Sequence, residues 1–163
     1  MVIKTTVDKI SSDEIVVFTT DTVLGLAISA KIEDNWKKLA ILKKRNIDKK
    51  IIILAADIED IKKITKWNNE AQRLSDLYWP GAVSLIINGI GFRIPNQKKL
   101  LEFLKINGPM FATSANISDQ PVAQTLEETS LIFPQINSFY YFGKHSGKAS
   151  KIIDVDNNKI LRN

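Results

Sequence analysis

Five polar segments in this 163-residue sequence carry side chains that could bind or activate a ligand, and two of them directly follow apolar runs. Residues 113–118 read Thr-Ser-Ala-Asn-Ile-Ser, and residues 19–22 read Thr-Thr-Asp-Thr. Hydroxyl and amide groups at the carboxyl ends of strands are well placed for ligands in open α/β sheets. The alternative for both segments is local, because the same side chains can cap a turn or a helix.

Lys43 is the most informative member of a basic segment, residues 43–50, which reads Lys-Lys-Arg-Asn-Ile-Asp-Lys-Lys. Such a charge run is usually a solvated surface. Lys43, however, follows Leu39 by four residues and Ala40 by three, so helical periodicity places it at the end of a buried helix face. A lysine in that position needs an anion, or it must extend its ammonium group to solvent.

A predicted β-hairpin places Ser84 and Arg93 side by side. Two apolar runs flank the dipeptide Asn-Gly at residues 88–89, which type I′ turns favour because both central residues have positive φ. Counting outward from this turn puts Ser84 directly opposite Arg93, on the same face of the hairpin. The arginine fork suits a carboxylate or a phosphate, and a structural salt bridge is the alternative.

Helices and strands alternate along the sequence and must position these side chains. The patterns predict strands at residues 15–18, 51–54, 83–87, 90–94, 110–112, 139–142, 152–155 and 160–161. They predict helices at residues 34–45, 57–64, 69–77 and 100–104, and one that opens with a capping box at residues 125–128. A weaker polar cluster, residues 147–151, precedes the last two strands, and Arg162 ends them. The prediction is an α/β fold whose sheet is mixed because of the hairpin.

Length and composition limit the classes of protein to which this chain can belong. A length of 163 residues with 44% hydrophobic and 25% charged residues predicts a single globular domain over residues 1–163. Cysteine is absent and His145 is the only histidine, so neither disulfides nor a protein-held metal centre is expected. No run approaches the ~18 apolar residues of a membrane span, and we expect a cytoplasmic protein without a membrane partner. The net charge of +5 permits an anionic partner such as a nucleotide or RNA, and an A/T-rich genome is the alternative source of the lysines.

Taken together, and in order from about residue 18 to residue 162, these segments resemble the YrdC-type threonylcarbamoyl-AMP synthases. The family patterns are similar to residues 19–27, 43–45, 79–84, 93–95 and 113–118, with Lys49 where a further lysine is usual. Four positions depart from them: Leu24, Asn46, Ser84 and Asp119 stand where the family has tyrosine, proline, threonine and glycine. Ser84 keeps the hydroxyl group, whereas Leu24 removes an aromatic wall that would pack on threonine.

The resemblance implies a twisted open α/β sheet around a positively charged cavity that holds ATP, Mg²⁺ and L-threonine. The reaction it implies joins threonine, bicarbonate and ATP into threonylcarbamoyl-AMP and pyrophosphate, which makes the chain a nucleotidyltransferase. By similarity, the residues expected to contact ATP are Lys43, Arg45, Ser114, Asn116 and Arg162. Those expected to hold threonine are Thr20, Arg93, Thr113 and Ser150. Lys43, Arg45 and Lys49 are the catalytic candidates, which act by electrostatic stabilisation, and Asp21 is a weak candidate for a general base.

The resemblance also implies that the product passes to a tRNA threonylcarbamoyl transferase complex, which modifies the adenosine beside the anticodon. Two alternatives stay open. An RNA-binding protein of the same fold would use the basic cavity for structured or double-stranded RNA, although no aromatic stripe accompanies the basic residues. A carbamoyl-transfer domain of hydrogenase-maturation proteins would share the nucleotide motifs, but those proteins are much longer and contain zinc-binding regions.

Overall fold

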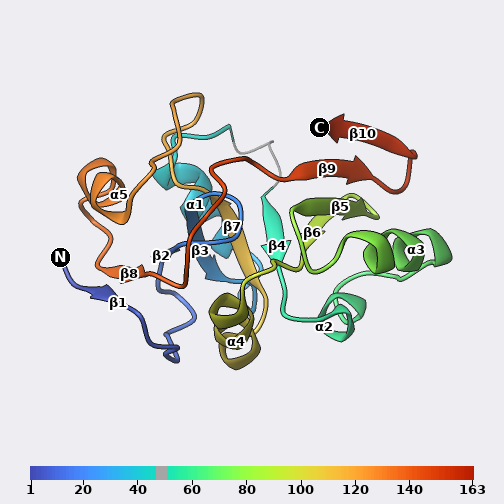
Figure 1. Cartoon of the computed structure of the whole chain (residues 1–163), viewed down its shortest axis with the longest axis horizontal. Coiled ribbons are helices and arrows are strands. Elements are labelled where there is room, and N and C mark those ends of the chain that lie inside the picture. Colours follow the sequence, from blue (N-terminus) through green and yellow to red (C-terminus); the bar gives the residue numbers. More distant parts are fainter. Residues whose placement is uncertain (47–50) are drawn as a thin grey trace.

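The computed structural model describes residues 1–46 and 51–163, and within these residues ten strands form one open sheet (Figure 1). The strands lie in the order β1-β8-β2-β3-β7-β4-β6-β5-β9-β10. Their bounds are β1 Ile3–Lys4, β2 Val16–Phe18, β3 Gly25–Ser29, β4 Ile52–Leu54, β5 Val83–Ile87, β6 Ile90–Arg93, β7 Met110–Ser114, β8 Ser138–Tyr140, β9 Lys151–Asp154 and β10 Lys159–Arg162. The catalytic candidate Lys49 lies outside the described residues.

The sheet is mixed, as predicted. Strands β1 and β2 both run parallel to β8, β4 runs parallel to β6, and β5 runs parallel to β9. The pairs β2–β3, β3–β7, β4–β7, β5–β6 and β9–β10 are antiparallel. The α/β fold with helices flanking a mixed open sheet is therefore confirmed.

The β5–β6 hairpin has the predicted register. Ile87 pairs with Ile90 and Leu85 with Phe92, which leaves Asn88 and Gly89 as the two-residue turn. Both turn residues have positive φ, 51° for Asn88 and 78° for Gly89, as a type I′ turn requires.

Strand β3 is the main element that the sequence patterns do not predict. Its five residues are all buried, and it lies between β2 and β7 near the middle of the sheet. The sequence Gly-Leu-Ala-Ile-Ser contains small residues of low strand propensity, so the pattern after residue 22 favours a turn or a helix start instead. A Cβ atom on Gly25 would lie only 3.1 Å from Cε1 of Phe18, so this position accepts glycine for packing reasons.

Five helices flank the sheet in the described residues. They are α1 Asn35–Leu42, α2 Ile58–Lys62, α3 Asn69–Tyr78, α4 Lys98–Asn107 and α5 Leu126–Ile132. No helix in the described ranges has the length and apolar character to cross a membrane. The predicted cap at Thr125 is present, since its hydroxyl accepts from Glu128 N at 3.1 Å. The Glu128 carboxylate accepts from Gln124 N rather than from Thr125 N, so the capping box is shifted by one residue.

Helix α1 ends three residues earlier than predicted, at Leu42, and Lys43 forms its C-cap. The backbone reverses there because Lys44 has a φ of 52°, in the left-handed region. Asp34 stands at the N-cap as predicted, but its carboxylate makes no capping bond and pairs instead with Lys37 Nζ at 2.9 Å.

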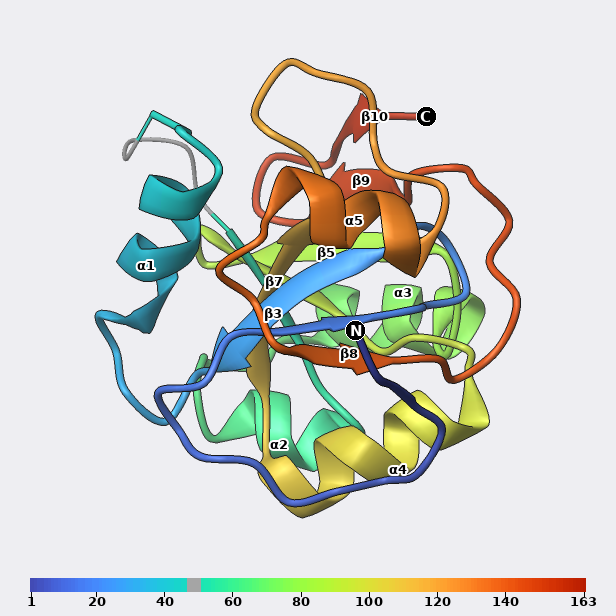
Figure 2. The same cartoon turned by 90° about the vertical axis from the view of Figure 1, so that its left-hand side faces the viewer.

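The core is divided between the two faces of the sheet because alternate strand residues point to opposite sides. Val17 packs with side chains of α1 and α5, whereas Val16 and Phe18 pack with Phe103 of α4. Figure 2 shows α4 and α5 on opposite sides of β3 and β8. A separate cluster joins the β5–β6 hairpin to α2 and α3.

Phe103 is the aromatic centre of the α4 face. It is fully buried, with its ring 5.1 Å from Tyr140 and 5.3 Å from Phe142. We expect Phe103→Ala to lower the free energy of unfolding by about 3–5 kcal/mol, because the lost transfer energy adds to that of the cavity left behind. Urea denaturation measures this change. Ile106→Ala, at a half-exposed position of the same helix, should change stability by less than about 0.5 kcal/mol; similar losses for both variants would contradict this account of the core.

Candidate functional site

The predicted polar segments meet around one cavity of about 290 Å³. Strands β3 to β7, β9 and β10 all contribute to its walls. Its polar lining consists of hydroxyl groups and guanidinium groups: Thr20, Thr22, Ser84, Thr113, Ser114, Ser150, Arg45, Arg93 and Arg162. The rest of the wall is aliphatic, and no described residue of the lining is aromatic. Cationic donors and hydroxyls around an apolar wall are suited to a ligand that is part anionic and part apolar.

Lys43 lies beneath this cavity with 2% of its surface exposed, which confirms its predicted burial. Its ammonium donates to Ser114 O at 2.6 Å, to Asn116 Oδ1 at 2.8 Å and to Ser114 Oγ at 3.4 Å. These acceptors are all uncharged. Desolvation, helped by the nearby charge of Arg45, lowers the pKa of Lys43 to about 8.

The segment after β7 wraps around this lysine. Ser118 N donates to Lys43 O at 2.9 Å, and Asn116 Nδ2 donates to Gln120 O at 2.7 Å. The Ser114 hydroxyl donates to Asn116 Oδ1 at 2.7 Å, so the lysine and the serine share one amide oxygen. The structure therefore joins Lys43, Ser114 and Asn116 in a single hydrogen-bonded group.

Arg45 extends the positive charge into the cavity. Its Nη1 lies 3.4 Å from the Thr113 hydroxyl, which it meets at the end of β7. Burial lowers the pKa of this guanidinium. Arg45 and Lys43 thus reach the same strand end from one short stretch of chain.

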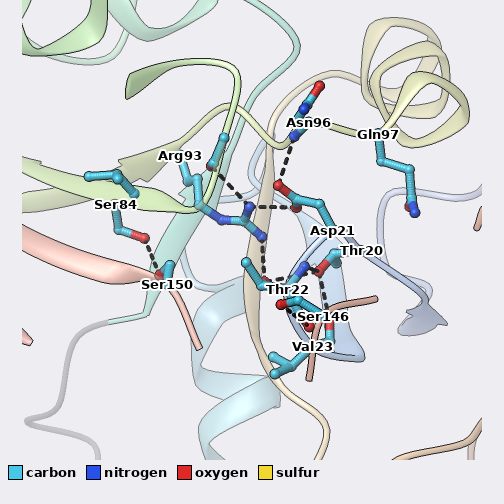
Figure 3. A network of polar contacts seen from close by, with 12 residues as sticks. Thr20, Asp21, Thr22, Val23, Ser84, Arg93, Asn96, Gln97, Ser146 and Ser150 are labelled. Carbon is cyan, nitrogen blue, oxygen red and sulfur yellow. Dashed lines mark hydrogen bonds and ion pairs between the residues drawn. The ribbon is translucent and has the colours of Figure 1, made fainter. Parts of the chain in front are cut away.

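Arg93 also lines the cavity and is 3% exposed, and Figure 3 shows its polar contacts. Its Nη1 donates to Asp21 Oδ1 at 2.6 Å and to Gly81 O at 3.3 Å, and its Nη2 donates to Thr22 Oγ1 at 3.1 Å. Arg93 therefore forms the salt bridge that was the alternative raised by the sequence, and it also lines the cavity, which leaves ligand binding by Arg93 as a prediction. Asp21, the weak candidate for a general base, has both carboxylate oxygens engaged, Oδ2 by Asn96 N at 2.9 Å.

Thr20 directs its hydroxyl into its own turn. Its Oγ1 donates to Val23 O at 2.7 Å and accepts from Thr22 N at 3.0 Å. The Thr20 hydroxyl therefore makes the turn contacts that were the alternative to ligand binding for residues 19–22. Thr20 and Thr22 nevertheless both line the cavity. Thr22 and Asp21 are the residues of this segment that contact Arg93, and only the three-dimensional pairing of the two segments reveals these contacts.

The hydroxyl groups of two serines and the guanidinium group of Arg162 lie together where β5, β9 and β10 adjoin. Ser84 Oγ lies 2.8 Å from Ser150 Oγ, while Arg162 donates from Nε to Ser150 O at 2.7 Å. Burial, and next the charge of Arg93, lower the pKa of Arg162. Arg162, predicted to contact ATP, therefore lies beside Ser150 and near Arg93, two residues predicted to hold threonine.

The described residues contain no cluster of three or more His, Cys, Asp or Glu side chains that could hold a metal ion. Asp21 is the carboxylate that contacts the site, and its oxygens are engaged as described above. A cation in this cavity would need its ligands mainly from hydroxyls, from water and from an incoming anion.

A family model matches residues 8–163; it is that of the Sua5/YciO/YrdC family, described as "Telomere recombination". The match covers nearly the whole chain, so the chain belongs to the Sua5/YciO/YrdC family. The resemblance inferred from the sequence motifs is thereby confirmed.

Several relatives are named threonylcarbamoyl-AMP synthase. A putative one from Methanocaldococcus jannaschii is 28% identical, covering 94% of this chain and 80% of its own length. One from Buchnera aphidicola (subspecies Acyrthosiphon pisum) is 26% identical, covering 93% of this chain and 97% of its own.

Solved structures show the same fold. A variant of Sua5 from P. abyssi superposes with a TM-score of 0.78 at 27% identity, covering 88% of this chain and 49% of the other. YciO of E. coli gives a TM-score of 0.79 at 18% identity, covering 91% and 82%. This chain thus spans about half the length of the P. abyssi protein.

The lowered pKa of Lys43 makes stability depend on pH in a defined window. Between about pH 8 and 10.5 the unfolded chain holds more protons at this lysine than the folded chain, so its contribution to stability rises with pH. We expect Lys43→Met to remove this rise, which would appear as a pH-dependent difference between the unfolding curves of variant and wild type. Lys44→Met alters the exposed neighbour and should leave the pH dependence unchanged; the same change of slope in both variants would contradict the assignment.

Proposed function

We propose that this chain is an L-threonylcarbamoyladenylate synthase, which makes threonylcarbamoyl-AMP and pyrophosphate from L-threonine, bicarbonate and ATP. The observation that carries the proposal is the cavity lined by three arginines and six serine or threonine hydroxyls, in a chain of this family. The names of its relatives support it, as does a solved structure of P. abyssi Sua5 in complex with L-threonine. That protein shares 24% identity and a TM-score of 0.80 with this chain.

The ATP phosphates belong, in this proposal, at the end of the cavity formed by the Lys43 group and Arg45. Ser114 and Arg45 line the cavity there, and Lys43 and Asn116 support Ser114 from below. An anion at this end would restore a charged partner to a lysine whose described acceptors are neutral, which favours binding. The aliphatic wall, including Ile51 and Ile52, offers an apolar surface for the adenine ring.

Threonine belongs at the Arg93 end. Its carboxylate would accept from the guanidinium, and the hydroxyls of Thr20 and Ser150 line the same space. Thr113 lies at the Arg45 end, 3.4 Å from Arg45 Nη1, and the carboxylated amine of threonine would approach the α-phosphate beside it. Arg162, which donates to the Ser150 hydroxyl, would face the place where the carboxylated amine of threonine approaches the α-phosphate.

The proposed chemistry needs positioning and charge stabilisation rather than a protein nucleophile. The threonine amine and bicarbonate combine to a carbamate with loss of water, a carbamate oxygen attacks the α-phosphorus, and the bond to pyrophosphate breaks. Negative charge shifts onto phosphate oxygens during this step. Lys43 and Arg45, with Lys49 as a third candidate outside the described residues, would stabilise that charge without reorganising.

Mg²⁺ would enter this site with ATP. The cavity offers hydroxyl oxygens but no carboxylate cluster among the described residues, which fits an ion carried mainly by phosphates and water. Its contribution when bound would be to neutralise phosphate charge. The tRNA threonylcarbamoyl transferase complex as recipient of the product is likewise part of the proposal.

The direct test is pyrophosphate release by the purified chain mixed with ATP, Mg²⁺, threonine and bicarbonate. We expect release that requires both threonine and bicarbonate, with threonylcarbamoyl-AMP identified by mass spectrometry. Release that ignores threonine would overturn the proposal. Tight RNA binding that weakens steeply with salt and is indifferent to threonine would support the RNA-binding alternative instead.

Arg93→Ala separates the two substrates. We expect the Kd of threonine to rise by tenfold or more, since a charge-assisted hydrogen bond contributes about 1.5–3 kcal/mol, while ATP affinity changes by less than about twofold. Calorimetry with each substrate checks this expectation. Arg73→Ala, at an exposed ion pair on α3, is the matched control and should change neither value. Equal losses for ATP and threonine in Arg93→Ala would refute the assigned role.

A further inference from the structure

Asp21 is in contact with the site without lining it. The cavity wall includes Thr20, Thr22 and Arg93, but not Asp21. The Asp21 side chain is 16% exposed and that of Arg93 4% exposed, and the two meet at 2.6 Å. Any effect of Asp21 on a ligand must therefore be transmitted mainly through the arginine.

The acceptors around Arg93 fix the plane of its guanidinium. Asp21 Oδ1 and Gly81 O hold Nη1, and Thr22 Oγ1 holds Nη2, so both terminal nitrogens are engaged from known directions (Figure 3). A guanidinium has five N–H donors, so three such contacts leave donors for a ligand in the cavity that Arg93 lines. Two fixed nitrogens on a planar group determine where the remaining donors point.

Asp21 is itself held from two sides. Its Oδ2 accepts from Asn96 N at 2.9 Å, three residues after Arg93, and its backbone oxygen accepts from Ser146 N at 3.1 Å. The carboxylate therefore bridges the turn after β2 to the chain that follows β6. Because each oxygen already accepts a hydrogen bond, Asp21 is suited to orient Arg93 rather than to take up a proton.

The negative charge of Asp21 also distinguishes Arg93 from other cations of the site. Lys43 and Arg162 contact neutral oxygens in the described part of the chain, whereas Arg93 has a carboxylate at 2.6 Å. An arginine paired in this way still donates to a single carboxylate, but it attracts a polyphosphate less strongly than an unpaired arginine does.

We propose that Asp21 is a positioning and specificity-determining residue, which orients Arg93 for the substrate carboxylate and keeps polyphosphate away from that end of the cavity. The inference rests on the proposed function for the identity of the carboxylate. It predicts opposite effects on two ligands, which a general loss of structure would not produce.

The first experiment measures the binding of threonine and of inorganic pyrophosphate to Asp21→Asn by calorimetry. An asparagine keeps the shape of the side chain, but it has one acceptor oxygen where two donors, Arg93 Nη1 and Asn96 N, now bind. We expect threonine to bind about tenfold more weakly, for the loss of one charge-assisted bond, and pyrophosphate about threefold more tightly, for the loss of one nearby negative charge.

A double-mutant cycle with Arg93→Ala shows whether Asp21 acts through the arginine. In the Arg93→Ala background, Asp21→Asn should change threonine affinity by less than about twofold. An equal loss in both backgrounds, weaker binding of both ligands, or a lower kcat with unchanged threonine affinity would each overturn the proposal. Glu70→Gln removes a carboxylate from another arginine, also at 2.6 Å but on the exposed surface, and should change neither affinity.

A second measurement is made on the wild-type chain without substrate, so its result does not depend on whether the Asp21 and Arg93 variants fold. NMR of ¹⁵N-labelled arginine side chains should show slow rotation of the Arg93 guanidinium, with separate Nη signals, and fast averaging for the exposed Arg73. Fast averaging at Arg93 would overturn the positioning role. If Arg93 is ordered but the protein does not bind threonine, the proposed function fails while the orientation by Asp21 stands.

Discussion

The burial of the Lys43 ammonium among neutral oxygens is the interaction on which the site depends. The lysine holds Ser114 O and Asn116 Oδ1 directly, and its own carbonyl accepts from Ser118 N, so the loop after β7 closes around it. Helix α1 and β7 are joined by this contact although they are far apart in sequence. The positive charge is paired with dipoles alone in the described residues, which leaves a field directed toward the cavity above Ser114.

Features that depend on local spacing were predictable from the sequence. The register of the β5–β6 hairpin followed from Asn88 and Gly89, since a two-residue turn permits only one pairing. Burial of Lys43 followed from helical periodicity, even though α1 itself ends at Leu42. The motifs also led to the family, but they do not by themselves establish which side chain contacts which substrate.

Features that depend on long-range pairing were not predictable. Strand β3 has a single β-branched residue, Ile28, and no aromatic residue, and its burial arises from its neighbours β2 and β7. The ion pair joins Asp21, in the turn between β2 and β3, to Arg93 of β6, although β7 and β4 lie between β3 and β6 in the sheet. No periodicity within either segment encodes that contact, so the sequence alone does not show that the carboxylate of Asp21 is already paired.

The position of β8 in the sheet has a consequence for synthesis of the chain on the ribosome. Phe18 of β2 pairs with Tyr140 of β8, so one edge of β2 has no strand beside it until most of the chain has been made. At about 5–20 residues per second, that interval lasts on the order of ten seconds. During this time one backbone edge of the apolar strand Val16–Phe18 lacks its partner, and an unpaired strand edge is a template for aggregation and a segment for chaperones to shield.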